Sequence, residues 1–110
     1  MAYKNRATIE TVRSLAFGGI GAAYAAVGAI TTVPTRILYA VNATDKDLWI
    51  SDDGTNNKFF IPTGSFILID LTANKVRDDG FFLPEQTYWY AKHAGAAPTS
   101  GSIYITLING

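Results

Sequence analysis

The stretch of residues 35–71 decides the fold class, and it reads TRILYAVNATDKDLWISDDGTNNKFFIPTGSFILIDL. It contains four short apolar runs, each rich in β-branched or aromatic residues and followed by residues that favour turns. The runs are 37–41, 48–51, 58–61 and 65–71, separated by 42–47, 52–57 and 62–64. Each connection is too short for a crossover helix, so strands that follow one another are expected to run antiparallel. The pattern is therefore typical of an antiparallel sheet.

Further strands are expected on both sides of this stretch, over residues 14–17, 22–27, 87–92 and 102–108. We therefore expect a single all-β domain over residues 14–110, an antiparallel β-sandwich or small barrel of about seven to eight strands. Residues 1–13 are polar and mixed in charge, and they are interpreted as an extended N-terminal arm, with a short helix over 7–13 as the alternative.

Residues 16–30 are the most ambiguous segment, because nearly every position is small or apolar. The segment is too short and too rich in glycine for a membrane span, and it lacks the spacing of an amphipathic helix. Strands separated by a turn or bulge at 18–21 fit better, although a helix stays as the alternative.

Two segments show the alternation of a strand with one buried face. In 102–108, Ile103, Ile105 and Leu107 are expected to point inward and Tyr104, Thr106 and Ile108 outward. That outward set is not very polar, which suggests either a middle position in the sheet or a docked partner. In 87–92, Thr87, Trp89 and Ala91 are expected to share the face opposite Tyr88, Tyr90 and Lys92.

The composition indicates a surface that contacts protein. Nine basic and nine acidic residues give a net charge of zero, so no overall field attracts nucleic acid or an anionic membrane. Only 16% of the 110 residues are charged, against roughly a quarter in an average soluble domain. Because a small domain has much surface for its volume, sparse charge favours protein contacts. The alternative is a monomer with a neutral surface of Thr, Asn and Gly.

No residue pattern indicates catalysis. The chain has no cysteine and a single histidine, His93, so thiolate sites and transition-metal sites lack their usual ligands. We interpret His93 as a solvated or hydrogen-bonded loop residue. We therefore expect no enzyme activity, no catalytic residues, no cofactor and no metal site.

Three groups of residues have a possible functional interpretation, but a simpler structural interpretation is preferred for each. Asp45, Asp47, Asp52 and Asp53 could offer oxygen ligands to calcium, but their spacing matches no EF-hand loop, and turn hydrogen bonding is preferred. The sequon-like segment 42–44 is likewise interpreted as an Asx turn.

The aromatic set could stack on sugars or single-stranded nucleic acid, but core and interface packing is preferred because no basic patch accompanies it. That set is Trp49, Tyr88, Trp89 and Tyr90.

Several segments together resemble a known class of protein. They are RSLAFGGI (13–20), PTRI (34–37), NATD (42–45), SDDGTN (51–56), IPTGSF (61–66), FLPEQTYWYAK (82–92) and GSIY (101–104). These segments resemble small all-β virion structural proteins of tailed bacteriophages, and the resemblance covers most of residues 13–110. It implies a module present in many copies at the neck, on the capsid surface or where tail and fibres join. It carries over no functional residues.

We therefore expect a non-enzymatic virion protein, made in the host cytoplasm without a secretion signal, that forms homo-oligomers and binds other phage virion proteins. A neck, tail-adaptor or appendage-attachment role is favoured, with capsid decoration as the alternative. The residues expected to contact neighbours are Tyr3, Arg6, Ile9, Tyr104 and Ile108. We expect no nucleic acid, membrane or small-molecule ligand as partner.

A carbohydrate-binding module is the alternative from another functional class. In that case Trp49 or Trp89 would stack on a sugar ring, and loop Asp residues would orient its hydroxyl groups.

Overall fold

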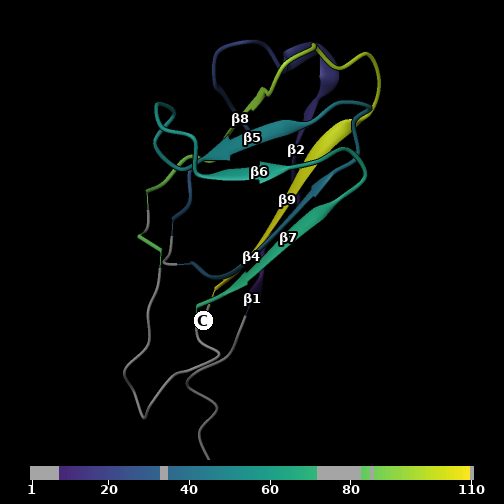
Figure 1. The fold of residues 1–110 in the computed structure, drawn as a ribbon. Coiled ribbons are helices and arrows are strands. Elements are labelled where there is room, and N and C mark those ends of the chain that lie inside the picture. Colours follow the sequence, from purple (N-terminus) through teal and green to yellow (C-terminus); the bar gives the residue numbers. More distant parts are fainter. Residues whose placement is uncertain (1–7, 33–34, 72–82, 85, 110) are drawn as a thin grey trace, which may run out of the picture.

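The computed structural model describes residues 8–32, 35–71, 83–84 and 86–109, which form two antiparallel sheets packed face to face (Figure 1). In this described part, sheet A contains β1 (Thr8–Ile9), β2 (Arg13–Ala16), β9 (Ser102–Asn109), β4 (Thr35–Asn42) and β7 (Phe66–Asp70). Sheet B contains β3 (Ala25–Ala26), β8 (Tyr90–His93), β5 (Leu48–Ser51) and β6 (Phe59–Ile61). β1 and β2 follow one another along the same edge of β9, so each sheet has four strand positions. The predicted all-β antiparallel sandwich is confirmed.

The four strands of residues 35–71 are divided between the two sheets and do not form one sheet in chain order. β4 pairs with β7 in sheet A, whereas β5 pairs with β6 in sheet B. The β5–β6 hairpin is thus enclosed in sequence by the β4–β7 pair but lies in the opposite layer. The expectation that strands adjacent in sequence lie side by side in one sheet was wrong for β4 with β5 and for β6 with β7, because the segments 43–47 and 62–65 carry the chain across the sandwich.

The side chain of Asn42, at the end of β4, holds these two crossings together. It is fully buried, and its amide nitrogen donates to the carbonyls of Lys46 at 2.8 Å and Ile61 at 2.9 Å. Its Oδ1 accepts from the backbone N–H of Thr44 at 3.0 Å and from the Thr44 hydroxyl at 2.6 Å. The predicted Asx turn is confirmed, and the same amide also connects this turn to the end of β6.

The core lies between the inner faces of the two sheets. Ile103, Ile105 and Leu107 of β9 are fully buried, while Tyr104 is 41% exposed, so the predicted alternation of this strand is confirmed. Trp89 and Ala91 are also buried, as expected from their shared face. The remaining members of the buried apolar cluster are Ile20, Val27, Leu38, Ala40, Leu48, Ile50 and Ile61.

Residues 16–30 contain a 3-10 turn over Phe17–Gly19 and the two-residue strand β3, so the preferred interpretation is confirmed over the helix. The expected strand over 22–27 is shorter than predicted. The segment nevertheless runs beside β8, because Gly21 accepts from the N–H of His93 at 3.1 Å and Val27 donates to Trp89 at 2.6 Å. Thr8–Ile9 is a strand, so the helix considered over 7–13 is not formed there.

Two loop carboxylates fasten their surroundings by accepting hydrogen bonds. Asp45 accepts from the hydroxyl of Thr99 and from the backbone N–H groups of Thr99 and Ser100, linking the β4–β5 and β8–β9 connections. Its pKa is lowered, chiefly by the Thr99 hydroxyl. Asp53 accepts from the Ser51 hydroxyl at 2.7 Å and from two N–H groups of its own loop, which likewise lowers its pKa. The preferred turn interpretation agrees with these contacts.

Two glycines with positive φ provide a matched test of the crossing geometry. A Cβ on Gly101 (φ 84°) would lie 2.0 Å from the Ala43 carbonyl oxygen, whereas a Cβ on Gly64 (φ 73°) would meet no atom within 4 Å. We expect Gly64→Ala to lower the free energy of unfolding by about 1 kcal/mol, the ordinary cost of a left-handed alanine. Gly101→Ala should cost more than about 3 kcal/mol because the Ala43 backbone must also move. Urea denaturation monitored by tryptophan fluorescence measures both values, and equal losses would contradict the close approach.

Acidification should remove the contribution of Asp45 to stability. Its folded-state pKa lies below the ordinary value of 3.8, so its stabilisation is fully present above that pH and is lost as the pH falls through the folded-state pKa. We expect Asp45→Asn to be less stable than the natural protein near neutral pH, with the difference shrinking in acid. Urea denaturation from about pH 6 to about pH 2 measures it.

Thr63→Ala is the control, because it removes the hydroxyl that donates to the Thr44 carbonyl at 2.5 Å but no titrating group. Its stability deficit should stay constant over the same pH range. A deficit of Asp45→Asn that also stays constant would show that the Asp45 carboxylate contributes nothing pH-dependent.

Candidate functional site

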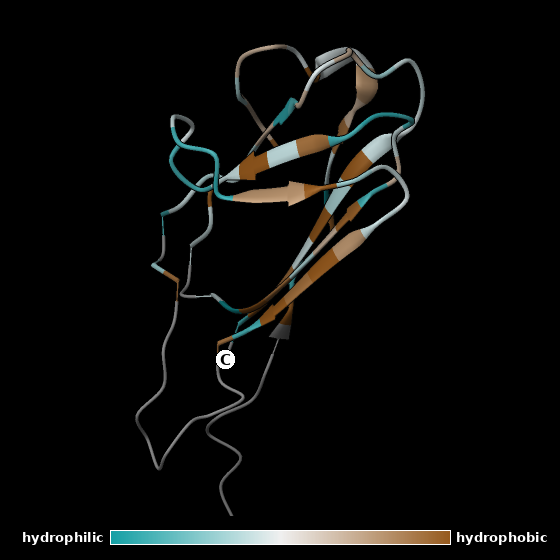
Figure 2. Cartoon of the chain, in the orientation of Figure 1, coloured by the Kyte–Doolittle hydropathy of each residue, from teal (hydrophilic) through white to brown (hydrophobic). Residues whose placement is uncertain are grey.

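The outer face of sheet A is apolar over most of β1, β9, β4 and β7, while β2 adds the exposed Ser14 and Ala16 at its edge. We call it the apolar face, and its outward positions are Ile9, Ile37, Tyr39, Val41, Phe66, Leu68, Tyr104, Thr106 and Ile108. Leu68 is 61% exposed and Ile9 70% exposed, although both are large hydrophobic side chains. In Figure 2, β7 is coloured hydrophobic along most of its length, which matches a strand with two apolar faces. Exposed apolar surface of this continuity is typical of a protein interaction site.

The strand register arranges this face in cross-strand rows. Tyr39 of β4 lies between Thr106 of β9 and Leu68 of β7. Val41 lies between Tyr104 and Phe66 in the next row, and the rings of Tyr39 and Phe66 are 5.5 Å apart. The third row runs from Ile9 through Ile108 and Ile37 to Asp70, the only charged residue that these described rows contain. Burying this face would therefore desolvate almost no charge.

The structure brings three of the predicted contact residues together. Ile9 and Ile108 are directly paired across β1 and β9, and Tyr104 lies on the same face of β9. Tyr3 and Arg6 lie outside the described residues, so their expected role stays a prediction. β9 occupies a middle position in its sheet, one of the two explanations for its apolar outer side. Tyr104 is still 41% exposed in that position, so the neighbouring strands do not cover the outer side of β9.

Sequence reasoning missed the centre of the apolar face, formed by Tyr39, Phe66 and Leu68. Their signal was present in the uninterrupted apolar run of β7, which is typical of a strand that is hydrophobic on both sides. The pairing of β7 with β4 was needed to show that these side chains join those of β9.

The predicted aromatic set is divided between the core and the outer face of sheet B. Trp89 is buried, and its indole nitrogen has no hydrogen-bond partner in the described structure. Trp49 is half-buried and contacts Phe60 edge to face, with ring centroids 5.1 Å apart. The packing interpretation is therefore confirmed for Trp89, whereas Trp49 lies on the outside of its strand.

Tyr24 has a polar environment beside this outer face. Its hydroxyl donates to Oδ1 of Asn57 at 2.5 Å, and the Nζ of Lys92 lies 4.8 Å from its ring centroid. Burial raises the pKa of Tyr24, and the negative charge of Asp53 raises it further. The phenol is therefore held in its neutral form and acts as a hydrogen-bond donor.

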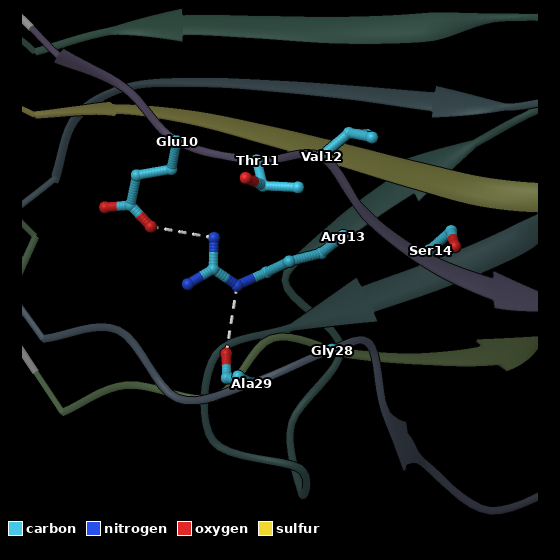
Figure 3. A pocket seen from close by; sticks show the side chains of 7 residues that line it. All are labelled: Glu10, Thr11, Val12, Arg13, Ser14, Gly28 and Ala29. Atoms are coloured by element: carbon cyan, nitrogen blue, oxygen red, sulfur yellow. Dashed lines mark hydrogen bonds and ion pairs between the residues drawn. The ribbon is translucent and has the colours of Figure 1, made fainter.

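A shallow pocket of about 410 Å³ lies where β1 gives way to β2 (Figure 3). Arg13 extends across it, paired with Glu10 at 2.9 Å and donating through Nε to the Ala29 carbonyl at 2.9 Å. Glu10 in turn accepts from the side-chain amide of Asn109 at 2.8 Å. These contacts join the edge of sheet A to the β3–β4 connection, so Arg13 has a structural task.

His93 ends β8 and does not lie in the following loop. The side chain is half-buried, and its Nδ1 is buried without a hydrogen-bond partner among the described residues, so the predicted position in a loop was wrong. The reason is the β5–β8 pairing, which continues to Leu48 and His93 and so extends the strand through this residue.

The described residues contain neither a metal-binding cluster nor a helix that could span a membrane. No group of three or more His, Asp or Glu side chains in that part of the chain is arranged to hold a metal ion. None of its segments forms a helix with the length and hydropathy needed to cross a bilayer.

Comparison with known proteins adds no relative. No family model matches the chain, and neither the curated proteins nor the solved structures contain a significant match.

Proposed function

We propose that this chain is a non-enzymatic structural protein that assembles with copies of itself through the apolar face. The supporting observation is that Tyr39, Leu68 and Tyr104 are exposed together on a sheet face whose described rows contain a single charged residue, at the margin. Two such faces can pack against each other as the two inner faces of a sandwich do, about 10 Å apart.

A second copy of the chain is the occupant that the charges favour. A twofold interface brings the same surface patch together on both partners, so a face rich in one sign of charge would repel itself. The apolar face avoids that cost because its central positions are uncharged. The low overall content of charge, 16% of the residues, also agrees with a chain that buries much of its surface in an assembly.

The proposed setting is the virion of a tailed bacteriophage, at the neck or where tail and appendages join, with capsid decoration as the alternative. The resemblance to small virion proteins, which covers most of residues 13–110, supports this setting. In it, the N-terminal arm, with Tyr3 and Arg6, would bind other virion proteins.

Leu68→Lys tests the self-assembly. Leu68 is 61% exposed, so a lysine should change the free energy of unfolding by less than about 0.5 kcal/mol. In the assembly, however, the ammonium would be buried against apolar side chains, and we expect association to weaken at least about a hundredfold. Size-exclusion chromatography with light scattering should show an oligomer for the natural chain and a monomer for the variant.

Phe60→Lys is the matched control, because Phe60 is a 43% exposed aromatic residue on the outer face of sheet B. It should leave the oligomer intact. A natural chain that stays monomeric at high concentration, or a Leu68→Lys variant of unchanged mass, would exclude assembly through this face.

The virion setting has its own test. Purified phage particles carrying this chain with a C-terminal label should show the label at a fixed position in electron micrographs, repeated according to the symmetry of the neck, tail or capsid. Particles without label, from cells that contain the labelled chain, would rule out the virion role but not the self-assembly.

A further inference from the structure

The outer face of sheet B carries a row of rings around a lysine. Trp49 of β5 is paired with Lys92 of β8 on one side and with Phe60 of β6 on the other. Ala25 is paired with Ala91, which places the preceding residue, Tyr24, beside Lys92. We call Tyr24, Lys92, Trp49 and Phe60 the aromatic row. Its rings contact one another or the lysine, with Trp49 and Phe60 5.1 Å apart and the Lys92 ammonium 4.8 Å from the centre of the Tyr24 ring.

A polar pocket of about 280 Å³ adjoins Phe60 at one end of the aromatic row. Its other lining residues come from the β4–β5 and β8–β9 connections, and they are Lys46, Asp47, Ala94, Gly95 and Ala96. Asp47 uses one carboxylate oxygen to accept the N–H of Thr63 at 2.9 Å, and its other oxygen can accept from a ligand. Ring surface and hydrogen-bonding groups therefore lie next to each other, unlike the apolar face of sheet A.

Two lysines beside these rings have no carboxylate partner among the described residues. In the described part of the chain, the ion pairs engage Arg13 and Lys58, while neither Lys46 nor Lys92 has a carboxylate oxygen within 4.0 Å. Lys92 is instead held over the Tyr24 ring, whose hydroxyl is anchored on Asn57. An anionic group bound here would meet two cations whose charge is not already neutralised.

We propose that the aromatic row and the adjoining pocket bind an acidic saccharide, one that carries carboxylate or sulfate groups. The C–H face of a sugar ring would lie on Trp49 and Phe60, because such faces are apolar and suit aromatic rings. Lys92 and Lys46 bind the anionic groups, and Asp47 accepts from a ring hydroxyl. This proposal does not depend on self-assembly, which uses the opposite face of the molecule.

Single-stranded nucleic acid would also combine rings and anions, but the charges favour the saccharide. Binding along a phosphate backbone requires a continuous basic groove with many cations. Among the described residues, the rings have two lysines beside them, together with Asp47 in the pocket and Asp53 near Tyr24, and the whole chain has a net charge of zero. A sugar with one or two acidic groups matches that arrangement better than a nucleic acid strand, which carries a phosphate at every nucleotide.

A glycan array printed with neutral, uronic, sialylated and sulfated oligosaccharides, with oligothymidylate on the same slide, tests the proposal. We expect the natural protein to bind acidic glycans in preference to their neutral counterparts. Trp49→Ala should lower the affinity about tenfold or more through loss of the stacking surface. Lys92→Gln should lower it severalfold and reduce its dependence on salt, because one ion contact is lost. Isothermal titration with the best glycan measures these changes.

Phe17→Ala is the control, because it removes a similarly exposed ring, 41% exposed, from the 3-10 turn that follows β2, outside both the aromatic row and the apolar face, and it should bind as the natural protein does. Phe60→Ser replaces Trp49→Ala if circular dichroism shows that the latter has not folded. The proposal is overturned if no glycan binds, if neutral glycans bind equally well, if oligothymidylate binds as tightly, or if Phe17→Ala weakens binding as much as the changes in the aromatic row.

Discussion

The buried amide of Asn42 is the interaction on which the arrangement of the sandwich depends. An asparagine removed from water must satisfy two donors and an acceptor inside the protein, and here Lys46, Ile61 and Thr44 do so. These contacts join the end of β4 to the end of β6, at the point where the chain leaves one sheet for the other. With the crossing held, β5 and β6 pair in one layer while β4 and β7 pair in the opposite layer.

That topology produces two outer faces of different chemistry. β7 beside β4 continues the apolar side of β9, and the result is a broad face with little to hydrogen-bond. β6 beside β5 places Phe60 next to Trp49, with Lys92 on the other side of the same tryptophan. If two copies pack through sheet A, the aromatic rows point away from each other on both sides of the assembly. Repeated copies of a weak saccharide site would then act together and raise the overall affinity for a surface that carries many such sugars.

Local pattern predicted much of the strand content. Alternation along 102–108 indicated which side chains of β9 are buried, and the turn residues of 42–47 and 52–57 marked the ends of strands. Prediction from local pattern failed where the end of a strand or the surface that a side chain joins depends on residues distant in the sequence. His93 was expected in a loop because glycine and alanine follow it, but pairing with Leu48 extends β8 through it. The apolar face was only half predicted, through Ile9, Tyr104 and Ile108, since Tyr39 and Leu68 join it by strand pairing.

The sequence by itself determined that this chain forms antiparallel strands, where most of them lie, and, for the segments 87–92 and 102–108, which side faces the core. These properties depend on turn chemistry and on a period of two residues, both local along the chain. Only the tertiary structure decided which strands share a sheet and therefore which exposed side chains form a common surface. The physical reason is that contacts between remote segments make that choice, as when Asn42 bonds to Ile61 and Gly101 packs against the Ala43 carbonyl, where no side chain could fit.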